Sequence, residues 1–343
     1  MTQISARPAT VATTFDVAGV PAGAAGHTRI VEADLERRWL QHTGLLEEIC
    51  RYAMLPAGKL FRPVLLIESA LAVGGRLDTV LPAAVGTECG HVASLIHDDI
   101  IDDDDMRRGR PSVRARFGDA NAIVAGDLLI FRLFHYLADC HDAGASAERV
   151  TAALRATAMA GVDLCLGQAM ESELTGRLDC REEEYVEMAS LKTGALFRGA
   201  CEVGGLLGGG TRAQAAALAR YGHHLGIGFQ ICDDLLGYLS DPATTGKAAT
   251  SDLRNHRLTL PLILLLRQGG DDGRRLIERA FAEGSADVAA VTEALHHCGA
   301  VPAAQQIARD HCDIALEQLR NLPETIHRDA LSSFAHLAVR RVC

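Results

Sequence analysis

The chain has 343 residues, of which 48% are hydrophobic and 23% are charged, and its formal net charge at neutral pH is −10. This composition is typical of a globular protein with a sizeable core and excludes a disordered chain. The acidic balance argues against a general nucleic-acid-binding protein. Aromatic residues make up only 4% of the chain, whereas Ala and Leu are abundant. This bias favours helices over strands.

The ten cysteines are scattered along the chain and form no C-x-x-C pair, so a zinc site is not expected. Most of them lie in apolar helical contexts, where a free thiol behaves as a small hydrophobe. The N-terminus lacks the apolar core of a signal peptide, and no run of about 18 apolar residues indicates a membrane-spanning helix. We therefore expect a reduced, cytoplasmic protein without a membrane span.

Residues 1–27 carry few charges and no clear period, so we expect a mobile N-terminal arm. Helical spacing follows over residues 28–55 and ends at the Pro56-Ala57-Gly58 break. The next segment, GKLFRP, leads from this loop into the apolar helix VLLIESALAVGG. Lys59 and Arg62 at such a junction would strengthen the anion-binding tendency of a helix start. Taken alone, ordinary solvated surface charge explains them better.

The segment LIHDDIIDDDDMRRGRP, residues 95–111, lies at the end of a long helix that is expected from about Thr79. Six aspartates are followed at once by three arginines, namely Asp98, Asp99, Asp102, Asp103, Asp104 and Asp105, then Arg107, Arg108 and Arg110. Residues four apart share a helix face, where like charges destabilise the helix unless a cation offsets them. Carboxylates suit Mg²⁺, and arginines suit the phosphates that Mg²⁺ prefers to share. A solvated acidic helix end beside a basic loop is the alternative.

Small residues precede these aspartates at helical spacing: Ser94, Ala93, Gly90 and Gly86. A face of small residues lets another helix approach closely, or it leaves room for a long apolar ligand. Packing is the more common reason. A ligand gains weight only beside a reactive site.

Further apolar helices are expected over residues 121–137, about 146–176 and 186–207. The second contains Gln168 and Glu171, which could share a face. The third is interrupted by Lys192, and since a buried lysine is rare unless paired, it either reaches solvent or faces an anion.

A second acidic motif, GFQICDDLLGYLSD, lies on a helix expected from about Arg212 to Leu239. Asp233 and Asp234 follow an apolar stretch, where an ionised pair needs a partner. A loop with Lys247, Arg254 and Arg257 comes next, and residues 258–343 contain shorter amphipathic helices. Without β-type alternation or repeats, the sequence predicts an all-α fold, with residues 28–343 as one domain of about a dozen helices.

In matching order from about Gly58 to Pro261, the chain carries GKLFRP, DDIID with RRGRP, GQAME, KTG, FQICDDLLG and GK…SDLR…R. With these six pieces it resembles the trans-isoprenyl diphosphate synthases, or polyprenyl synthetases. The resemblance implies the isoprenoid synthase fold, a helical bundle around a central cavity. It also implies a homodimer that condenses isopentenyl diphosphate head-to-tail with an allylic diphosphate.

The resemblance implies a role for each matching residue. Three Mg²⁺ ions on the allylic diphosphate would be held by Asp98, Asp99, Asp102, Asp233 and Asp234. The residues expected to contact that diphosphate are Arg107, Lys192 and Lys247. The pocket for isopentenyl diphosphate would be formed by Lys59, Arg62, His91 and Arg108. Thr193 and Gln230 would lie near the ionising carbon, and Arg257 would help to close the site.

Three positions depart from the family pattern, and one of them, Glu171 in place of a common aspartate, is a mild change. Gly237 stands where the second motif usually has its last aspartate, so metal binding there must rest on Asp233 and Asp234. Leu60 replaces an arginine that is common in the first basic motif. These changes put part of the second metal site and one contact to isopentenyl diphosphate in question.

Product length in this family often depends on the residues four and five before the first motif, where bulky aromatics stop growth at about fifteen carbons. Here these residues are Ser94 and Ala93, and the deeper Gly90 and Gly86 would leave the tunnel open. Phe131, Phe134 or His135 on a neighbouring helix could close it. The expected product is geranylgeranyl diphosphate or somewhat longer.

Two alternatives share parts of this pattern. A class I terpene cyclase has the same fold and aspartate-rich motif, but it has no use for Lys59, Arg62 and His91, and its N-x-x-x-S-x-x-x-E type motif is missing here. A regulatory subunit of a heteromeric prenyl synthase would explain Leu60 and Gly237 as decay. The otherwise intact motifs argue against it.

Overall fold

The computed structural model describes residues 24–39, 44–239, 252–283 and 288–340. These residues form an all-α bundle, as predicted. Their β structure is one hairpin of two short strands, each two residues long. Residues 1–23 of the expected mobile arm lie outside the described residues. Its last residues do not belong to an arm, because α1 begins at Ala25, and Ala24 and Thr28 are buried against the bundle.

The helices of the first half are α1 (Ala25–Trp39), α2 (Leu45–Met54), α3 (Phe61–Ala72), α4 (Leu77–Ile101), α5 (Val113–Phe117), α6 (Asp119–Asp142) and α7 (Ala147–Leu174). Those of the second half are α8 (Glu182–Ala189), α9 (Ala195–Leu207), α10 (Arg212–Leu239), α13 (Leu260–Gln268), α14 (Gly270–Glu283), α15 (Val288–His297), α16 (Ala300–Leu319) and α17 (Ile326–Arg340). The bounds of α10 agree with its sequence pattern, in which apolar residues recur until the chain reaches Leu239.

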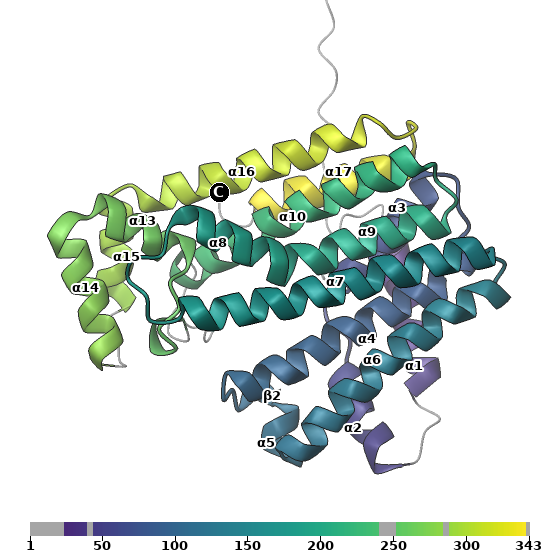
Figure 1. Cartoon of the computed structure of the whole chain (residues 1–343), viewed down its shortest axis with the longest axis horizontal. Helices are drawn as coiled ribbons and strands as arrows, with labels where there is room; N and C mark the ends of the chain where they lie inside the picture. The colour runs from purple at the N-terminus through teal and green to yellow at the C-terminus, as the bar shows by residue number, and fades with distance from the viewer. Residues whose placement is uncertain (1–23, 40–43, 240–251, 284–287, 341–343) are drawn as a thin grey trace, which may run out of the picture.

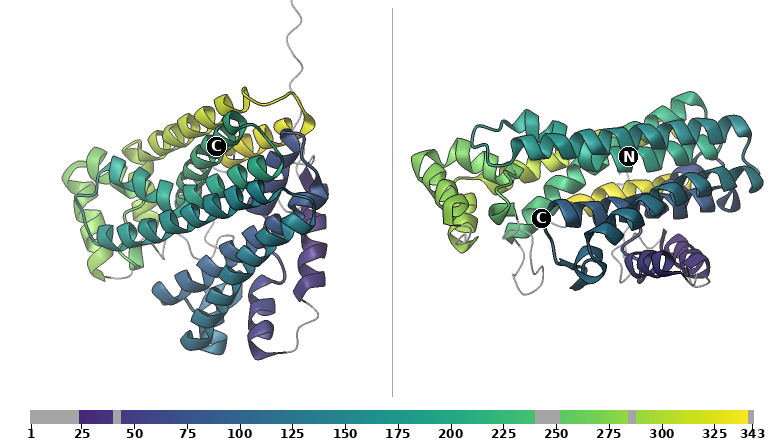
Figure 2. Two further views of the ribbon diagram at one scale, coloured as in Figure 1. Left: turned by 45° about the vertical axis from the view of Figure 1, so that its right-hand side comes forward. Right: turned by 60° about the horizontal axis from the view of Figure 1, so that its bottom comes forward.

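The long helices surround a common interior. Figure 1 shows α7, α9 and α10 side by side, with α16 and α17 beyond α10 and with α4 and α6 on the other side of α7. Helix α3 packs between α4 and α9, whereas α13, α14 and α15 gather at one end of the bundle. In Figure 2 the purple helices α1 and α2 lie on the outside of the α4 and α6 layer.

Two short strands, β1 (Met106–Arg107) and β2 (Arg110–Pro111), follow the first aspartate motif. The sequence does not predict these strands, because strands this short carry no alternating pattern. Arg108 and Gly109 form the turn between them, and both have positive φ angles of 51° and 74°. A two-residue loop with both residues in this region matches the right-handed twist of a hairpin.

The glycines before the first aspartate motif face a neighbouring helix. A Cβ on Gly90 would lie 2.9 Å from Leu133 Cδ2 of α6, and a Cβ on Gly86 would lie 3.1 Å from the Leu133 carbonyl oxygen. They therefore allow α4 and α6 to approach each other closely. The expectation that they leave the tunnel open is wrong for this reason, and packing, the more common role of such a face, is the one observed.

Helix α7 is long and apolar enough, by length and composition, to cross a membrane, and in Figure 1 it runs along the bundle beside α9. Only 22% of its most apolar window is buried. Its apolar side chains Met159, Val162 and Leu166 are exposed.

Candidate active site

A cavity of about 830 Å³ lies between the aspartate-bearing helix α4 and helices α3, α7, α9 and α10. Most of the predicted site residues line it: Lys59, Arg62, His91, Ser94, Asp98, Arg107, Arg108, Lys192, Thr193, Gln230 and Asp233. Segments more than 130 residues apart in the sequence thus meet around one space. Its apolar wall includes Leu95, Leu164, Leu196 and Phe229.

Arg62 and His91 form the buried floor of the end that the GKLFRP loop closes. The Arg62 guanidinium lies 4.6 Å from the centre of the Phe197 ring and donates to His91 Nε2 at 3.2 Å. Burial lowers the pKa of Arg62 to about 10. Burial, followed by the neighbouring arginines, lowers the pKa of His91 well below its usual range. His91 is therefore neutral at pH 7 and accepts from Arg62, and the pair offers donors to an anion.

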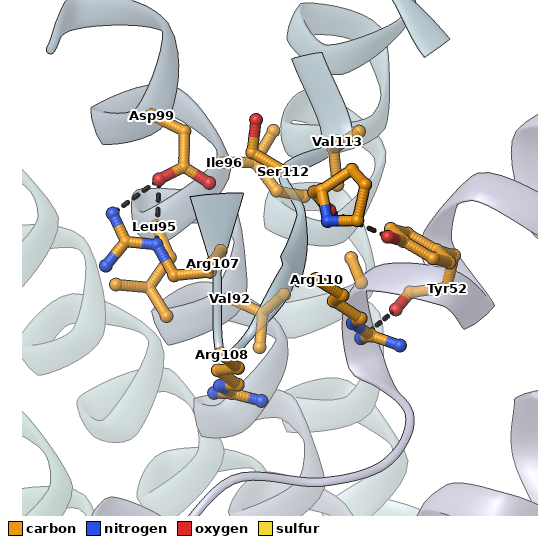
Figure 3. A pocket seen from close by; sticks show the side chains of 12 residues that line it. Tyr52, Val92, Leu95, Ile96, Asp99, Arg107, Arg108, Arg110, Ser112 and Val113 are labelled. Atoms are coloured by element: carbon orange, nitrogen blue, oxygen red, sulfur yellow. Dashed lines mark hydrogen bonds and ion pairs between the residues drawn. The ribbon is translucent and has the colours of Figure 1, made fainter. Parts of the chain in front are cut away.

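The hairpin sends its arginines in different directions, as Figure 3 shows. Arg107 turns to Asp99, to which its Nε donates at 2.7 Å. Arg108 lies at the tip of the turn, and Arg110 donates to the Leu55 carbonyl at 2.9 Å. The turn thus points its three arginines in different directions. Arg107 binds a carboxylate, Arg108 lines the cavity, and Arg110 binds the backbone of the preceding loop.

The carboxylates of the first motif differ in their partners. Asp98 lines the cavity, and burial raises its pKa while Lys192 acts in the opposite direction. Asp99 is 2% exposed and bonded to Arg107, and Asp102 is paired with Arg257. Asp103 and Asp105 are exposed, whereas Asp104 is half-buried and lies 3.8 Å from Arg107 and 3.6 Å from Arg254.

Lys192 and Thr193 occupy a single π-helical turn, Ser190–Gly194, between α8 and α9. Such turns often occur at functional sites, because they re-aim side chains within a helix. Lys192 Nζ lies 2.5 Å from Glu171 of α7, so this lysine is paired, and it also faces the cavity. A Cβ on Gly167 would lie 2.4 Å from the Lys192 backbone nitrogen, so only glycine permits this approach of α7 to the turn.

The second motif is linked to Thr193 by a chain of hydrogen bonds. Thr193 Oγ1 donates to Gln230 Oε1 at 2.6 Å, and Gln230 Nε2 donates to Asp234 Oδ1 at 2.7 Å. The hydroxyl of Tyr185 donates to the other oxygen of Asp234 at 2.6 Å. Burial nevertheless raises the pKa of Asp234 well above its usual range. Asp233, in contrast, is exposed to the cavity.

The donor set is suited to Mg²⁺, since it consists of carboxylate oxygens beside cations that can hold phosphate. Asp98 and Asp233 face the cavity from α4 and α10, and Asp99 and Asp102 lie beside Asp98. Within the described residues, no three His, Cys, Asp or Glu side chains form a preformed metal cluster. Mg²⁺ usually takes one or two carboxylates together with substrate phosphates, and the carboxylates that face the cavity fit this pattern.

Some predicted residues lie elsewhere. Ala93 does not line the cavity, because it is 1% exposed and belongs to the apolar core. Phe131 is 74% exposed on the outside of α6 and His135 is also exposed, so neither can close a tunnel from within. Phe134 alone of these three packs against the core. Lys247 lies outside the described residues.

The sequence pattern did not single out Glu88, Leu164 and Asp252, among other residues of the site. Glu88 is 2% exposed and lines the cavity one turn before His91. Leu164 lies one turn before Gln168 on α7, a spacing that could have revealed it. Asp252 lies beside the second motif, where burial is the main cause that raises its pKa to about 7 and Glu171 and Asp233 add to it, against the opposite effect of Arg257.

Comparison with known proteins agrees with this arrangement. The family model for polyprenyl synthetases matches residues 43–298. A short chain isoprenyl diphosphate synthase of Methanothermobacter thermautotrophicus is 38% identical over 83% of this chain and 86% of its own length. The octaprenyl diphosphate synthase of Escherichia coli K12 is 32% identical over 87% of this chain and 90% of its own.

Solved structures agree in fold over nearly the whole chain. A geranylgeranyl pyrophosphate synthetase from Pyrococcus horikoshii superposes with a TM-score of 0.83 at 32% identity, over 93% of this chain and 97% of that one. A polyprenyl synthase from Caulobacter crescentus, complexed with calcium and isoprenyl diphosphate, gives a TM-score of 0.84 at 28% identity over 92% and 96%. The matching family model and the curated relatives show that the enzyme is a prenyltransferase. The chain belongs to the polyprenyl synthetase family.

Proposed function

We propose that this enzyme condenses isopentenyl diphosphate head-to-tail with an allylic diphosphate to give a linear polyprenyl diphosphate. The observation that carries the proposal is the single cavity with two differently charged ends. One end gathers Lys59, Arg62 and Arg108, and the other gathers the carboxylates of both aspartate motifs with Lys192. A terpene cyclase would need the carboxylates and Lys192 but not the cations Lys59, Arg62 and Arg108.

Asp98, Asp99, Asp102 and Asp233 would hold Mg²⁺, with Asp234 behind them, and three ions are expected from the family. When bound, Mg²⁺ neutralises charge on the leaving diphosphate. Arg107 and Lys192 stabilise the same developing charge as fixed cations. We propose the same role for Lys247, and a role for Arg257 in closing the site through its pairing with Asp102.

The reaction breaks the allylic C–O bond and forms a carbon–carbon bond to isopentenyl diphosphate, after which the new cation loses a proton to the released diphosphate. Thr193 and Gln230 are fixed by their mutual hydrogen bond and present oxygen atoms beside the cation. The apolar wall of Leu95, Leu164 and Phe229 excludes the water that would otherwise trap it.

We propose geranylgeranyl diphosphate or a somewhat longer chain as the main product. Ser94 lines the cavity, and its side chain is too small to stop a growing prenyl chain. Leu164 and Leu196 form part of the apolar wall that such a chain would contact. Ser94→Phe should therefore shorten the product. Ala93→Phe should instead lower the melting temperature, because Ala93 is packed in the core. Equal product lengths for the Ser94→Phe and wild-type enzymes would refute this tunnel.

We further propose that a second copy of the chain covers the exposed apolar face of α6 and α7, giving a homodimer. The face consists of Ile123, Val124, Phe131, Met159, Val162 and Leu166, each at least 47% exposed. They recur at helical spacing on two adjacent helices, and contiguous apolar patches of this kind mark interaction sites.

Light scattering after size-exclusion chromatography should give a dimer for the wild type and a monomer for Phe131→Asp. Ile326→Asp is the matched control, because Ile326 is 78% exposed on α17, away from this face.

We also propose a cytoplasmic location, which the free cysteines within the described residues support.

The decisive test is a product assay. Purified protein is incubated with Mg²⁺, isopentenyl diphosphate and, separately, dimethylallyl, geranyl or farnesyl diphosphate, and the products are identified by mass spectrometry. Elongated linear diphosphates are expected. Cyclic hydrocarbons formed without isopentenyl diphosphate would indicate a cyclase, and no turnover with any primer would indicate a chain that needs a partner.

A further inference from the structure

Glu88 is a carboxylate at the cationic end of the cavity. It lies on α4, is 2% exposed and lines the same space as Lys59, Arg62 and Arg108. An anion here opposes the binding of a diphosphate, so its presence needs a physical reason. The neighbouring arginines provide one.

Arg108 and Arg62 are the charges that favour the ionised form of Glu88, against burial, which raises the pKa of its carboxyl group. The relation is mutual. Among the charges that raise the pKa of Arg62 and of Arg108, Glu88 is the largest for both, while burial lowers the two values. Glu88 is therefore a buried counter-charge to two guanidinium groups that line the same cavity, and Asp233 is a second one for Arg62.

The two arginines are constrained to different degrees. Arg62 is fixed by the Phe197 ring and by His91, and its Nε is buried without a hydrogen-bond partner among the described residues. Arg108 lies at the tip of the exposed hairpin turn. Its guanidinium rests on Gly58, where an added Cβ would come within 2.6 Å of it. Arg108 can thus swing into solvent unless a charge holds it inside.

We propose that Glu88 is a positioning residue, whose buried carboxylate keeps Arg62 and Arg108 turned into the cavity as a preformed pair of donors for the homoallylic diphosphate. This inference rests on the proposed function. The repulsion between Glu88 and the diphosphate is offset by three surrounding cations. Loss of Glu88, in contrast, removes the counter-charge that Arg62 and Arg108 share and frees Arg108, the more exposed of the two, to leave.

The test measures binding of isopentenyl diphosphate by calorimetry to the full chain in EDTA, together with the KM values of both substrates. Glu88→Gln keeps the shape of the side chain and removes its charge. It should raise the Kd and KM for isopentenyl diphosphate about tenfold, because misoriented donors lose most of their advantage. The KM for the allylic substrate should stay within about twofold. An unchanged or lower Kd for isopentenyl diphosphate would overturn the inference.

A double-mutant cycle tests whether Glu88 acts through Arg108. In an Arg108→Gln background, Glu88→Gln should have little further effect, because the side chain that it positions is gone. Full additivity would overturn the inference. Glu88→Asp, which retains the charge, should bind more tightly than Glu88→Gln. If Glu88→Gln does not fold by circular dichroism, Glu88→Met, which also removes the charge at a similar length, takes its place.

Asp163→Asn is the matched control. Asp163 is paired with Arg198 at 2.7 Å between α7 and α9, outside the residues that line the cavity. Its removal should leave the Kd for isopentenyl diphosphate unchanged, and an equal rise would overturn the specific role of Glu88. A wild-type chain that neither binds nor elongates would instead refute the proposed function. Wild-type elongation combined with an unaffected Glu88→Gln refutes the inference alone.

Discussion

The two acidic helix ends share a pair of adjacent aspartates but differ in what surrounds them. At the end of α4, Asp98 faces the cavity while Asp99 and Asp102 have arginine partners from the hairpin and from residue 257. At the end of α10, only Asp233 faces the cavity, whereas Asp234 is buried and bonded to Tyr185 and Gln230. Identical letters thus provide three carboxylates beside cationic partners in one place and, in the other, a single carboxylate that faces the cavity with a buried carboxylate behind it.

The difference follows from how each helix ends. Helix α4 stops just after its aspartates and turns into the hairpin, so cations reach its carboxylates from outside. Helix α10 continues for another turn to Leu239, so the second aspartate of its pair is enclosed by α8 and α10. Gly237 removes the one further carboxylate that could have faced the cavity from that turn.

The largest expected effect is the loss of kcat when the carboxylate of either motif that faces the cavity is removed, and this loss should differ between the two motifs. Asp98→Asn should lower kcat by about 10³-fold or more, because it removes a carboxylate from the more complete ligand set. Asp233→Asn should lower it by about 10²-fold, because the second set is already reduced. Steady-state kinetics at saturating Mg²⁺ would measure both. A larger loss in Asp233→Asn would reverse the proposed ranking.

Removing the support of Asp234 should have an intermediate effect. Tyr185→Phe leaves one oxygen of a buried carboxylate without its donor, which should reduce the free energy of unfolding by about 1–3 kcal/mol. The hydroxyl favours the ionised carboxylate, so its loss raises the pKa of Asp234 further, and the acid limb of the activity profile should move to higher pH.

Denaturant unfolding and a pH–rate profile would measure the Tyr185→Phe effects. Tyr221→Phe is the matched control, since Tyr221 donates from a buried hydroxyl to the Leu331 carbonyl at 2.7 Å in a different apolar cluster. This control should lose stability without a change in the acid limb. A pH–rate profile for Tyr185→Phe that coincides with that of Tyr221→Phe would count against any catalytic importance of Asp234.

Placing an aspartate at position 237 should make the second motif more like the first in its number of carboxylates. Gly237→Asp places an acid four residues after Asp233, on the same helix face. The Mg²⁺ concentration for half-maximal activity should fall by about threefold to tenfold, because one more oxygen ligand is offered. Gly237→Asn has a similar size without the charge and should give a smaller change. An unchanged Mg²⁺ requirement in Gly237→Asp would mean that position 237 does not face the metal site.

The smallest expected effect is a loss of folding stability at low pH that comes from a histidine outside both motifs. It distinguishes unfolding at low pH from protonation of the site carboxylates. Burial, followed by His223 and His311, lowers the pKa of His224 to about 4. The unfolded chain therefore binds a proton that the folded chain does not, and stability should fall as the pH drops from about 6.5 to about 4. Since His224 is half-buried, about 1 kcal/mol is expected in total. Thermal unfolding of His224→Asn should lack this loss.

The sequence by itself determined the helical class, the order of the six motifs and the family, because each depends on residue types at short spacing. Apolar residues at helical intervals define the helices, and acidic pairs followed by basic loops define the chemistry. Hence most of the residues expected around the cavity came together there, from the loop before α3, from α3 and α4, from the hairpin, from the π-helical turn and from α10.

Only the tertiary structure decided which side chain of a neighbouring pair enters the cavity. Ser94 lines it while Ala93 is in the core, and Asp233 faces it while Asp234 supports it from behind. Adjacent residues on a helix point about 100° apart, so a small rotation of the helix exchanges their roles. That rotation is set by packing against other helices, such as the contact of Gly90 with Leu133, and no local pattern records it.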